Sequence, residues 1–203
     1  LDRRRGQAVE KYQNLLNSQK DENLKTVLRS RLAVLYEELH QHDKALELLR
    51  EVAKAEPDRL ESQLPLAFGL KEAGKNEEAL ALVEELAAKF PDHPHVVLVK
   101  GQILGAMGQA DKGVELLTSS PAGTEDPETF LLAASQLYVE TKKYEDAEKV
   151  VKKGLETLPD SESMHFQLGA IYERQEKYSN AEESFKKVLE KNPEHPGVLN
   201  YFG

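Results

Sequence analysis

Apolar and polar residues alternate along most of this chain with the period of an amphipathic α-helix. The clearest stretch runs from Ser161 to Pro193, where apolar or small residues recur three and four positions apart. A short polar turn divides this stretch into two helices, and a proline closes it. Gly169 and Ala181 are the slim positions at which one helix backbone can approach the other. The pattern predicts a helix–turn–helix unit.

The same unit recurs along the chain with a fixed spacing of 34 residues. The slim residue that opens the second helix repeats as Ala45, Ala79, Gly113, Ala147 and Ala181. The slim residue of the first helix repeats in step as Ala33, Ala67, Gly101, Ser135 and Gly169. A larger residue follows three positions later as Tyr36, Leu70, Leu104, Tyr138 and Tyr172. The closing proline stands at Pro57, Pro91, Pro159 and Pro193, with Glu125 in its place once. One period shared by four residue classes indicates a stacked repeat array.

This pattern resembles the tetratricopeptide repeat (TPR) family, whose unit is a 34-residue helix–turn–helix. The resemblance implies an all-α fold, a right-handed α–α superhelix (solenoid) of helix-turn-helix repeats. It also implies that the first helix of each pair lines a concave groove, where the family usually binds peptides or protein segments. The composition agrees, because Leu, Ala, Glu and Lys are plentiful and Trp is absent.

The repeat pattern divides the chain into five tandem units with partial units at both ends. The five units are expected at residues 26–59, 60–93, 94–127, 128–161 and 162–195. Residues 1–25 form an N-terminal helix and a linker; the helix is either the second helix of an earlier unit or a simple cap. Residues 196–203 begin a further first helix, in which Leu199, Phe202 and Gly203 match the repeat pattern. The sequence ends within this helix. We therefore expect this sequence to be an excerpt of a longer protein.

Prolines and capping residues predict local departures from the regular repeat. Asp58 is expected to cap the helix that follows it, and Pro65 to kink that helix or delay its start. Pro121 should end the second helix of the third repeat early and leave residues 118–126 as a loop. Helix should restart with Asp126 as its cap and Pro127 in its first turn. This loop is expected to be the softest part of the array and a hinge.

The formal net charge of −9 restricts the kinds of partner. An acidic surface argues against nucleic acid and against anionic membranes, because both need clustered Lys and Arg. No run approaches the roughly 20 apolar residues of a membrane span, so no direct membrane insertion is expected. The chain has no cysteine, which excludes disulfides and thiolate chemistry. These features leave the compartment open, since bacterial cytoplasm and cell envelope are both compatible.

The sequence contains no complete motif typical of catalysis, cofactor binding or metal binding. The run from Gly69 to Asn76 approaches a phosphate-binding loop, but Asn76 replaces the required hydroxyl and no strand precedes it. The six histidines lack the converging spacing of a zinc site. We expect a non-enzymatic protein with no catalytic residues, cofactor or metal.

The candidate binding site is the concave face of the first helices. By the resemblance, the partner-binding groove contains Val34, Leu64, Phe68, Lys71, Leu98, Gln102, Leu132, Gln136, Phe166 and Ala170. Some family members grip a terminal carboxylate with Lys, Asn and Arg at these places. Most of those places are apolar here, so that activity is not expected. An apolar stripe with polar edges suits an apolar or amphipathic protein segment.

The sequence therefore favours a protein–protein interaction scaffold or adaptor that binds such a segment in its groove. The first alternative is a structural or self-associating spacer, which forms homo-oligomers. The second is a substrate-recruiting region of a larger enzyme or of a cell-envelope assembly or secretion protein.

Overall fold

A computed structural model describes the backbone of residues 2–202 and the side chains of residues 4–201. Leu1 and Gly203, the latter assigned by the pattern to a further helix, lie outside the described residues. The described backbone is helical with short connections and contains no strand, which confirms the all-α, helix-pair class expected from the sequence. The chain divides into two compact units, Leu1–Pro91 (unit 1) and Asp92–Gly203 (unit 2).

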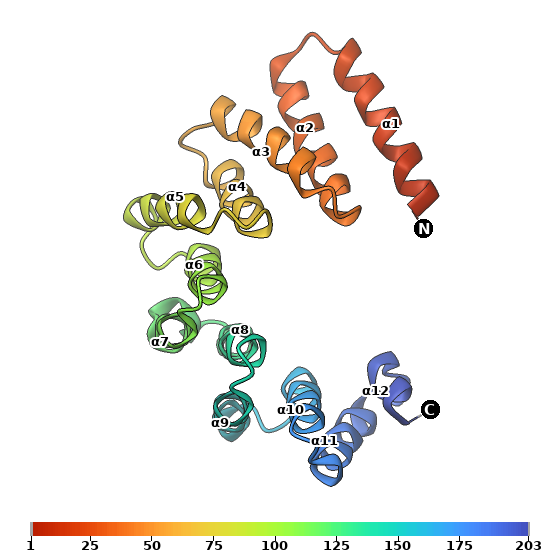
Figure 1. Ribbon diagram of the computed structural model, residues 1–203, viewed down its shortest axis with the longest axis vertical. Coiled ribbons are helices and arrows are strands. Elements are labelled where there is room, and N and C mark those ends of the chain that lie inside the picture. The colour runs from red at the N-terminus through yellow and green to blue at the C-terminus, as the bar shows by residue number, and fades with distance from the viewer. Residues whose placement is uncertain (1, 203) are drawn as a thin grey trace. The chain divides into compact units, whose positions relative to one another are not determined.

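Unit 1 contains five helices, each packed against the next along the chain (Figure 1). They are α1 (Asp2–Ser18), α2 (Glu22–Glu38), α3 (His42–Ala55), α4 (Leu60–Glu72) and α5 (Asn76–Lys89). Helix α1 is held on α2 by the buried Val9 and by Gln13, whose amide nitrogen lies 2.6 Å from the Tyr36 hydroxyl. The N-terminal helix is thus part of the packed unit.

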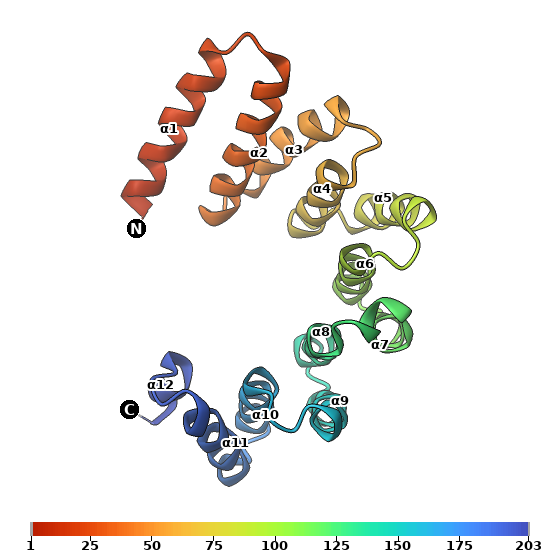
Figure 2. The same cartoon turned by 180° about the vertical axis from the view of Figure 1, so that it is seen from behind.

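Unit 2 continues the same alternation of first and second helices. Its elements are α6 (Pro94–Ala106), α7 (Ala110–Ser119), the 3₁₀ helix η1 (Pro121–Thr124), α8 (Pro127–Glu140), α9 (Tyr144–Thr157), α10 (Glu162–Arg174), α11 (Tyr178–Lys191) and α12 (Pro196–Phe202). Helix α8 contacts α6 and α10, so these first helices form one side of the unit (Figures 1 and 2). Helices α7, α9 and α11 form the other side.

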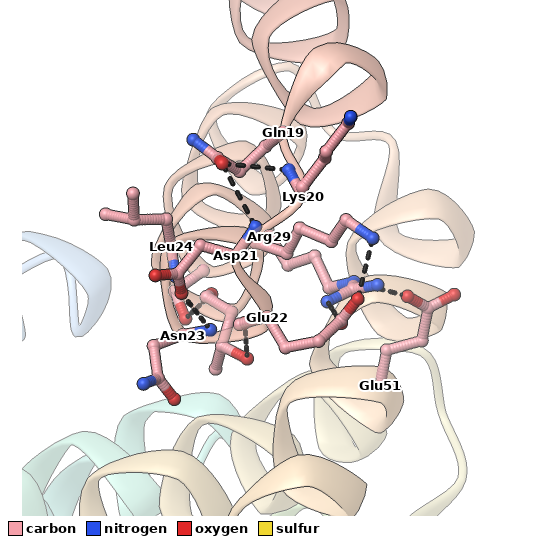
Figure 3. Close-up of polar contacts among 11 residues, drawn as sticks. Gln19, Lys20, Asp21, Glu22, Asn23, Leu24, Arg29 and Glu51 are labelled. Atoms are coloured by element: carbon pink, nitrogen blue, oxygen red, sulfur yellow. Dashed lines mark hydrogen bonds and ion pairs between the residues drawn. The ribbon is translucent and has the colours of Figure 1, made fainter.

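Polar contacts fix the connection between α1 and α2 (Figure 3). The Gln19 amide oxygen accepts hydrogen bonds from the two backbone N–H groups that follow it, at 2.8 and 3.0 Å. Asp21 caps α2 by accepting from the N–H groups two and three residues on, at 2.8 and 3.1 Å. Arg29 then joins α2 to α3, because its Nε lies 2.5 Å from a Glu51 carboxylate oxygen. The entry into the first regular helix pair is therefore defined by side chains as well as by packing.

The slim residues lie where the helices of a pair touch. Ala45, Ala79, Ala147 and Ala181 are fully buried. A Cβ built on Gly113 would lie 2.8 Å from the Gly101 carbonyl oxygen, which is a backbone atom that cannot rotate away. A Cβ on Gly169 would lie 2.5 Å from the Phe185 ring. The small residues recur because the two backbones approach too closely for anything larger.

Each first helix of a pair ends in the same left-handed turn. The residues with positive φ recur every 34 positions as His40, Gly74, Gly108, Lys142 and Glu176, with φ between 55° and 76°. The N–H of the next residue donates to the carbonyl five positions back, as from Lys177 to Tyr172 at 2.9 Å. This is the Schellman arrangement. Three of the five turns use a residue other than glycine, and each such turn costs about 1 kcal/mol of backbone strain.

Two points expected of α4 are wrong, namely Asp58 as its cap and a delayed start at Pro65, whereas a kink at Pro65 stays a prediction. Asp58 does not cap the helix; the N-cap is Arg59, which makes no side-chain capping bond. The Asp58 carboxylate instead lies 3.2 Å from the Lys89 ammonium group on α5. Pro65 does not delay the start, because α4 begins at Leu60 and continues through the proline. The packing of α4 between α3 and α5 overrides the local preference.

The third repeat departs from the others as the sequence predicts. Helix α7 has 10 residues, whereas α3, α5, α9 and α11 have 14. The expected loop retains order, since α7 continues to Ser119 and η1 follows with Ala122 buried. Asp126 caps α8 by accepting from the Thr129 N–H at 3.2 Å, which confirms that assignment. The softness of residues 118–126 stays a prediction.

Adding one methyl group at a slim glycine should destabilise the fold. We expect Gly113→Ala to lower the free energy of unfolding by about 1–3 kcal/mol, because the Gly101 carbonyl leaves no space. Gly6→Ala is the matched control, since a Cβ there meets nothing within 4 Å and alanine favours helix. Denaturant unfolding followed by circular dichroism measures both variants. Equal stability of Gly113→Ala and the wild type would contradict the packing argument.

Relieving a strained turn should stabilise the fold. Glu176 has φ of 60°, so Glu176→Gly should raise the free energy of unfolding by about 0.5–1 kcal/mol. Glu173→Gly, placed inside α10, should instead lower it by about 1 kcal/mol. The same unfolding measurement compares the two. Destabilisation by both substitutions would show that the turn is unstrained.

Candidate functional site

Three of the expected groove residues meet in one pocket of unit 2. The pocket has a volume of about 440 Å³ and lies between α8, α10 and the residue that precedes α12. Its principal lining residues are Leu132, Gln136, Glu162, Phe166, Gln167 and His195. The first helices of two neighbouring pairs thus contribute to the same concave surface.

The floor of this pocket is apolar and firmly packed. The Phe166 ring contacts the Phe185 ring, at 5.8 Å between centroids, and the His195 ring, at 4.8 Å. A Cβ on Gly197 would lie 2.9 Å from the Phe166 ring, so glycine permits α12 to approach. Phe166 and Leu132 are both half-buried against the core of unit 2. The exposed parts of the Phe166 and Leu132 side chains are therefore held in a fixed position.

The edges of the pocket are polar. The Gln167 amide nitrogen lies 3.4 Å from the Gln136 side-chain oxygen, and the Gln136 amide donates to Glu140 at 3.1 Å. On the other side, Glu162 accepts a hydrogen bond from the Asn192 amide at 3.2 Å. The arrangement provides amide groups and a carboxylate around an apolar floor. Such a surface suits the binding of an apolar group that has polar neighbours.

The other expected residues of unit 2 lie on the first helices α6 and α10, outside this pocket. Leu98 on α6 is half-buried and packs against the core that contains Val97 and Leu137. The side-chain oxygen of Gln102 is buried without a hydrogen-bond partner. Ala170 is half-buried one turn beyond Phe166 on α10. A role for these three residues in the groove stays a prediction.

The four remaining expected residues belong to unit 1. Val34 on α2 and Phe68 on α4 are exposed, at 55% and 39% of their surface. The Lys71 ammonium group lies 4.6 Å from the centre of the Phe68 ring, a cation–π contact, and Leu64 is half-buried. One continuous stripe from Val34 to Ala170 stays a prediction.

Sequence reasoning missed three polar residues of the pocket. Glu162, Gln167 and His195 were not among the expected groove residues. Gln167 follows the expected groove residue Phe166 directly, so helix periodicity gave a usable signal for it. His195 enters only because the turn after α11 folds back beside Phe166, which no local pattern indicates.

A separate polar network on the other side of unit 2 is structural. The Glu148 carboxylate on α9 lies 2.6 Å from the Lys152 ammonium group and 3.1 Å from that of Lys177. Partial burial raises the pKa of Glu148, but hydrogen bonds from Lys152, Lys177 and Gln175 outweigh it and lower the pKa to about 2. Because Lys177 follows α10, the network fastens one helix pair to the next.

Comparison with known proteins identifies the family. Three sequence profiles of the tetratricopeptide repeat match residues 30–59, 70–130 and 163–195, together more than half of the chain. The chain belongs to the tetratricopeptide repeat family. Its fold is consistent with a protein-interaction scaffold. No curated protein matches the sequence significantly.

Solved structures show the same fold at low sequence identity. A thermophilic TPR protein of Thermus thermophilus is 21% identical, with a TM-score of 0.64 over 87% of this chain and 96% of that one. A tetratricopeptide repeat protein of Parabacteroides merdae is 15% identical, with a TM-score of 0.66 over 90% and 71%. Residues 41 to the end of MamA from Desulfovibrio magneticus are 19% identical, with a TM-score of 0.57 over 84% and 97%.

Among residues 2–202, every helix is too short or too polar to cross a membrane.

Acid should weaken unit 2 through Glu148. Its pKa is depressed from 4.5 to about 2, so the stabilisation is complete above pH 4.5 and is lost as the pH falls toward 2. We expect Glu148→Gln to reduce the free energy of unfolding by about 1–2 kcal/mol at pH 7. The difference from the wild type should shrink between pH 4.5 and pH 2. Unfolding curves across this range measure it, and a pH-independent difference would contradict the assignment.

Proposed function

We propose that this protein is a non-enzymatic scaffold whose first helices bind an apolar or amphipathic segment of another protein. The observation that supports this most directly is the distribution of exposed large apolar side chains. Leu24, Val27 and Val34 lie exposed on α2, and Phe68 lies exposed on α4. Outside the first helices, the comparably exposed described side chains are Tyr178 on α11 and Leu15 on the N-terminal helix α1.

The stripe on α2 has the geometry of a binding surface. Leu24, Val27 and Val34 recur at three- and seven-residue intervals, so they share one face with the exposed Arg31 between them. Exposed apolar side chains do not stabilise the folded state in water. Contiguous apolar surface of this kind usually marks an interface. The pocket around Phe166 offers a second apolar contact on the first helices of unit 2.

The net charge of −9 makes nucleic acid an unsuitable partner in this proposal. Self-association through the same surface is the alternative, and the experiment below separates the two.

Introducing charge on the first helices should abolish capture. We expect Val34→Asp/Phe68→Asp to lose at least about tenfold of the bound partner, because both side chains are exposed and contribute little to the core. The assay is retention of proteins from a lysate of the source organism, quantified by mass spectrometry. Circular dichroism of the variant should be unchanged.

Tyr178→Asp is the matched control, since it places the same charge at an exposed aromatic residue on α11. It should retain the same proteins as the wild type. Identical retention by all three proteins would refute the proposed function. Wild-type oligomers that dissociate in Val34→Asp/Phe68→Asp, measured by light scattering, would favour self-association instead.

A further inference from the structure

We propose that the pocket between α8 and α10 selects a basic segment: it takes one apolar side chain and pairs Glu162 with a neighbouring Lys or Arg of the partner. This inference rests on the proposed function and adds to it the charge of the bound segment. It concerns unit 2 alone.

The apolar part of the pocket fits a side chain. The whole pocket has a volume of about 440 Å³. Pockets that bind small ligands in proteins have volumes of about 300–1,000 Å³. The floor consists of Leu132 and Phe166, and the Phe166 ring is held by Phe185 and His195. A preformed floor binds an apolar anchor without first losing its own conformational freedom.

The charge at the pocket is negative, because Glu162 lines it and no Lys or Arg does. The Glu162 side chain is 37% exposed and, among the described residues, forms no ion pair with a Lys or Arg. Its carboxylate lies 3.9 Å from the His195 imidazole, which completes an ion pair only when the histidine is protonated. Glu140, at the other end of the amide row, is exposed and accepts only from Gln136 within the described part of the chain.

Several carboxylates of unit 2 outside the pocket form ion pairs within the protein instead. Asp111, Asp146, Glu148 and Glu182 each lie within 3 Å of a lysine ammonium group of the protein itself. Glu162 lines the pocket and Glu140 adjoins it through Gln136, and among the described residues neither pairs with a lysine or arginine, so both are available to a partner's cation. A segment carrying Asp or Glu here would meet repulsion from both ends.

The amide groups complete the recognition surface. The Gln167 nitrogen has only long contacts of 3.4 Å, to Ser135 and Gln136. Amides can both donate to and accept from the backbone of an extended chain. The segment therefore binds in an extended form, with its apolar side chain on Phe166 and its basic side chain toward Glu162.

The test is selection from a random peptide library displayed on phage, against the immobilised full chain. We expect the wild type to enrich peptides in which Lys or Arg stands close in sequence to Leu, Ile, Phe or Met. Glu162→Gln removes the charge but keeps an acceptor for Asn192, so it should retain apolar peptides and lose the basic preference. Glu190→Gln, at an exposed residue of α11, is the matched control and should select as the wild type does.

Affinities of a selected peptide give the second readout. Replacing its basic residue by Gln should weaken binding to the wild type about fivefold, measured by fluorescence anisotropy, and should not affect binding to Glu162→Gln. Added salt should weaken only the charged pair. Thermal melting verifies that Glu162→Gln is folded; if it is not, Glu140→Gln, at an exposed site, replaces it in the same comparison.

The outcomes are distinct. Enrichment of apolar peptides without a basic preference, or a basic preference that survives Glu162→Gln and Glu140→Gln, overturns the inference and leaves the proposed function intact. A wild type that enriches no peptide removes both.

Discussion

The close approach of helix backbones at small residues is the constraint on which the rest of this structure depends. Where Gly113 lies on the Gly101 carbonyl, and where Gly169 lies under Phe185, there is no space for another methyl group. These contacts set the distance between the two helices of a pair, and the fully buried alanines set it elsewhere. Because every pair is closed in the same way, the neighbouring pairs of unit 2 can stack with their first helices α6, α8 and α10 on one side.

The first and second helices of a pair differ in how much of their surface the packing uses. The second helices pack between neighbouring first helices and use lysine–carboxylate pairs such as Lys143 with Asp111 to join successive repeats. The first helices retain surface that the fold does not need. In unit 1 this surface includes the exposed Val34 and Phe68, and in unit 2 it includes the pocket around Phe166 with its polar edges. The proposed recognition depends on these first-helix surfaces.

The sequence predicted the repeated part of the structure well and the irregular part less well. Period and helix type follow from residue classes that recur, so the helix pairs and the Asp126 cap could be identified directly. Asp58 was misassigned because a capping residue has competing partners, and here Lys89 is the partner. Glu162 and His195 join Phe166 only through tertiary packing, which a spacing rule does not contain. The groove as one continuous surface is still a prediction.

The shortened helix α7 has a consequence for how one repeat can differ from another. This second helix is about one turn shorter than the others, yet the next repeat begins at the expected position because η1 occupies the missing residues and buries Ala122. The 34-residue period therefore counts residues and not helical turns. A repeat that replaces a helical turn by a 3₁₀ turn of the same number of residues keeps its neighbours in register.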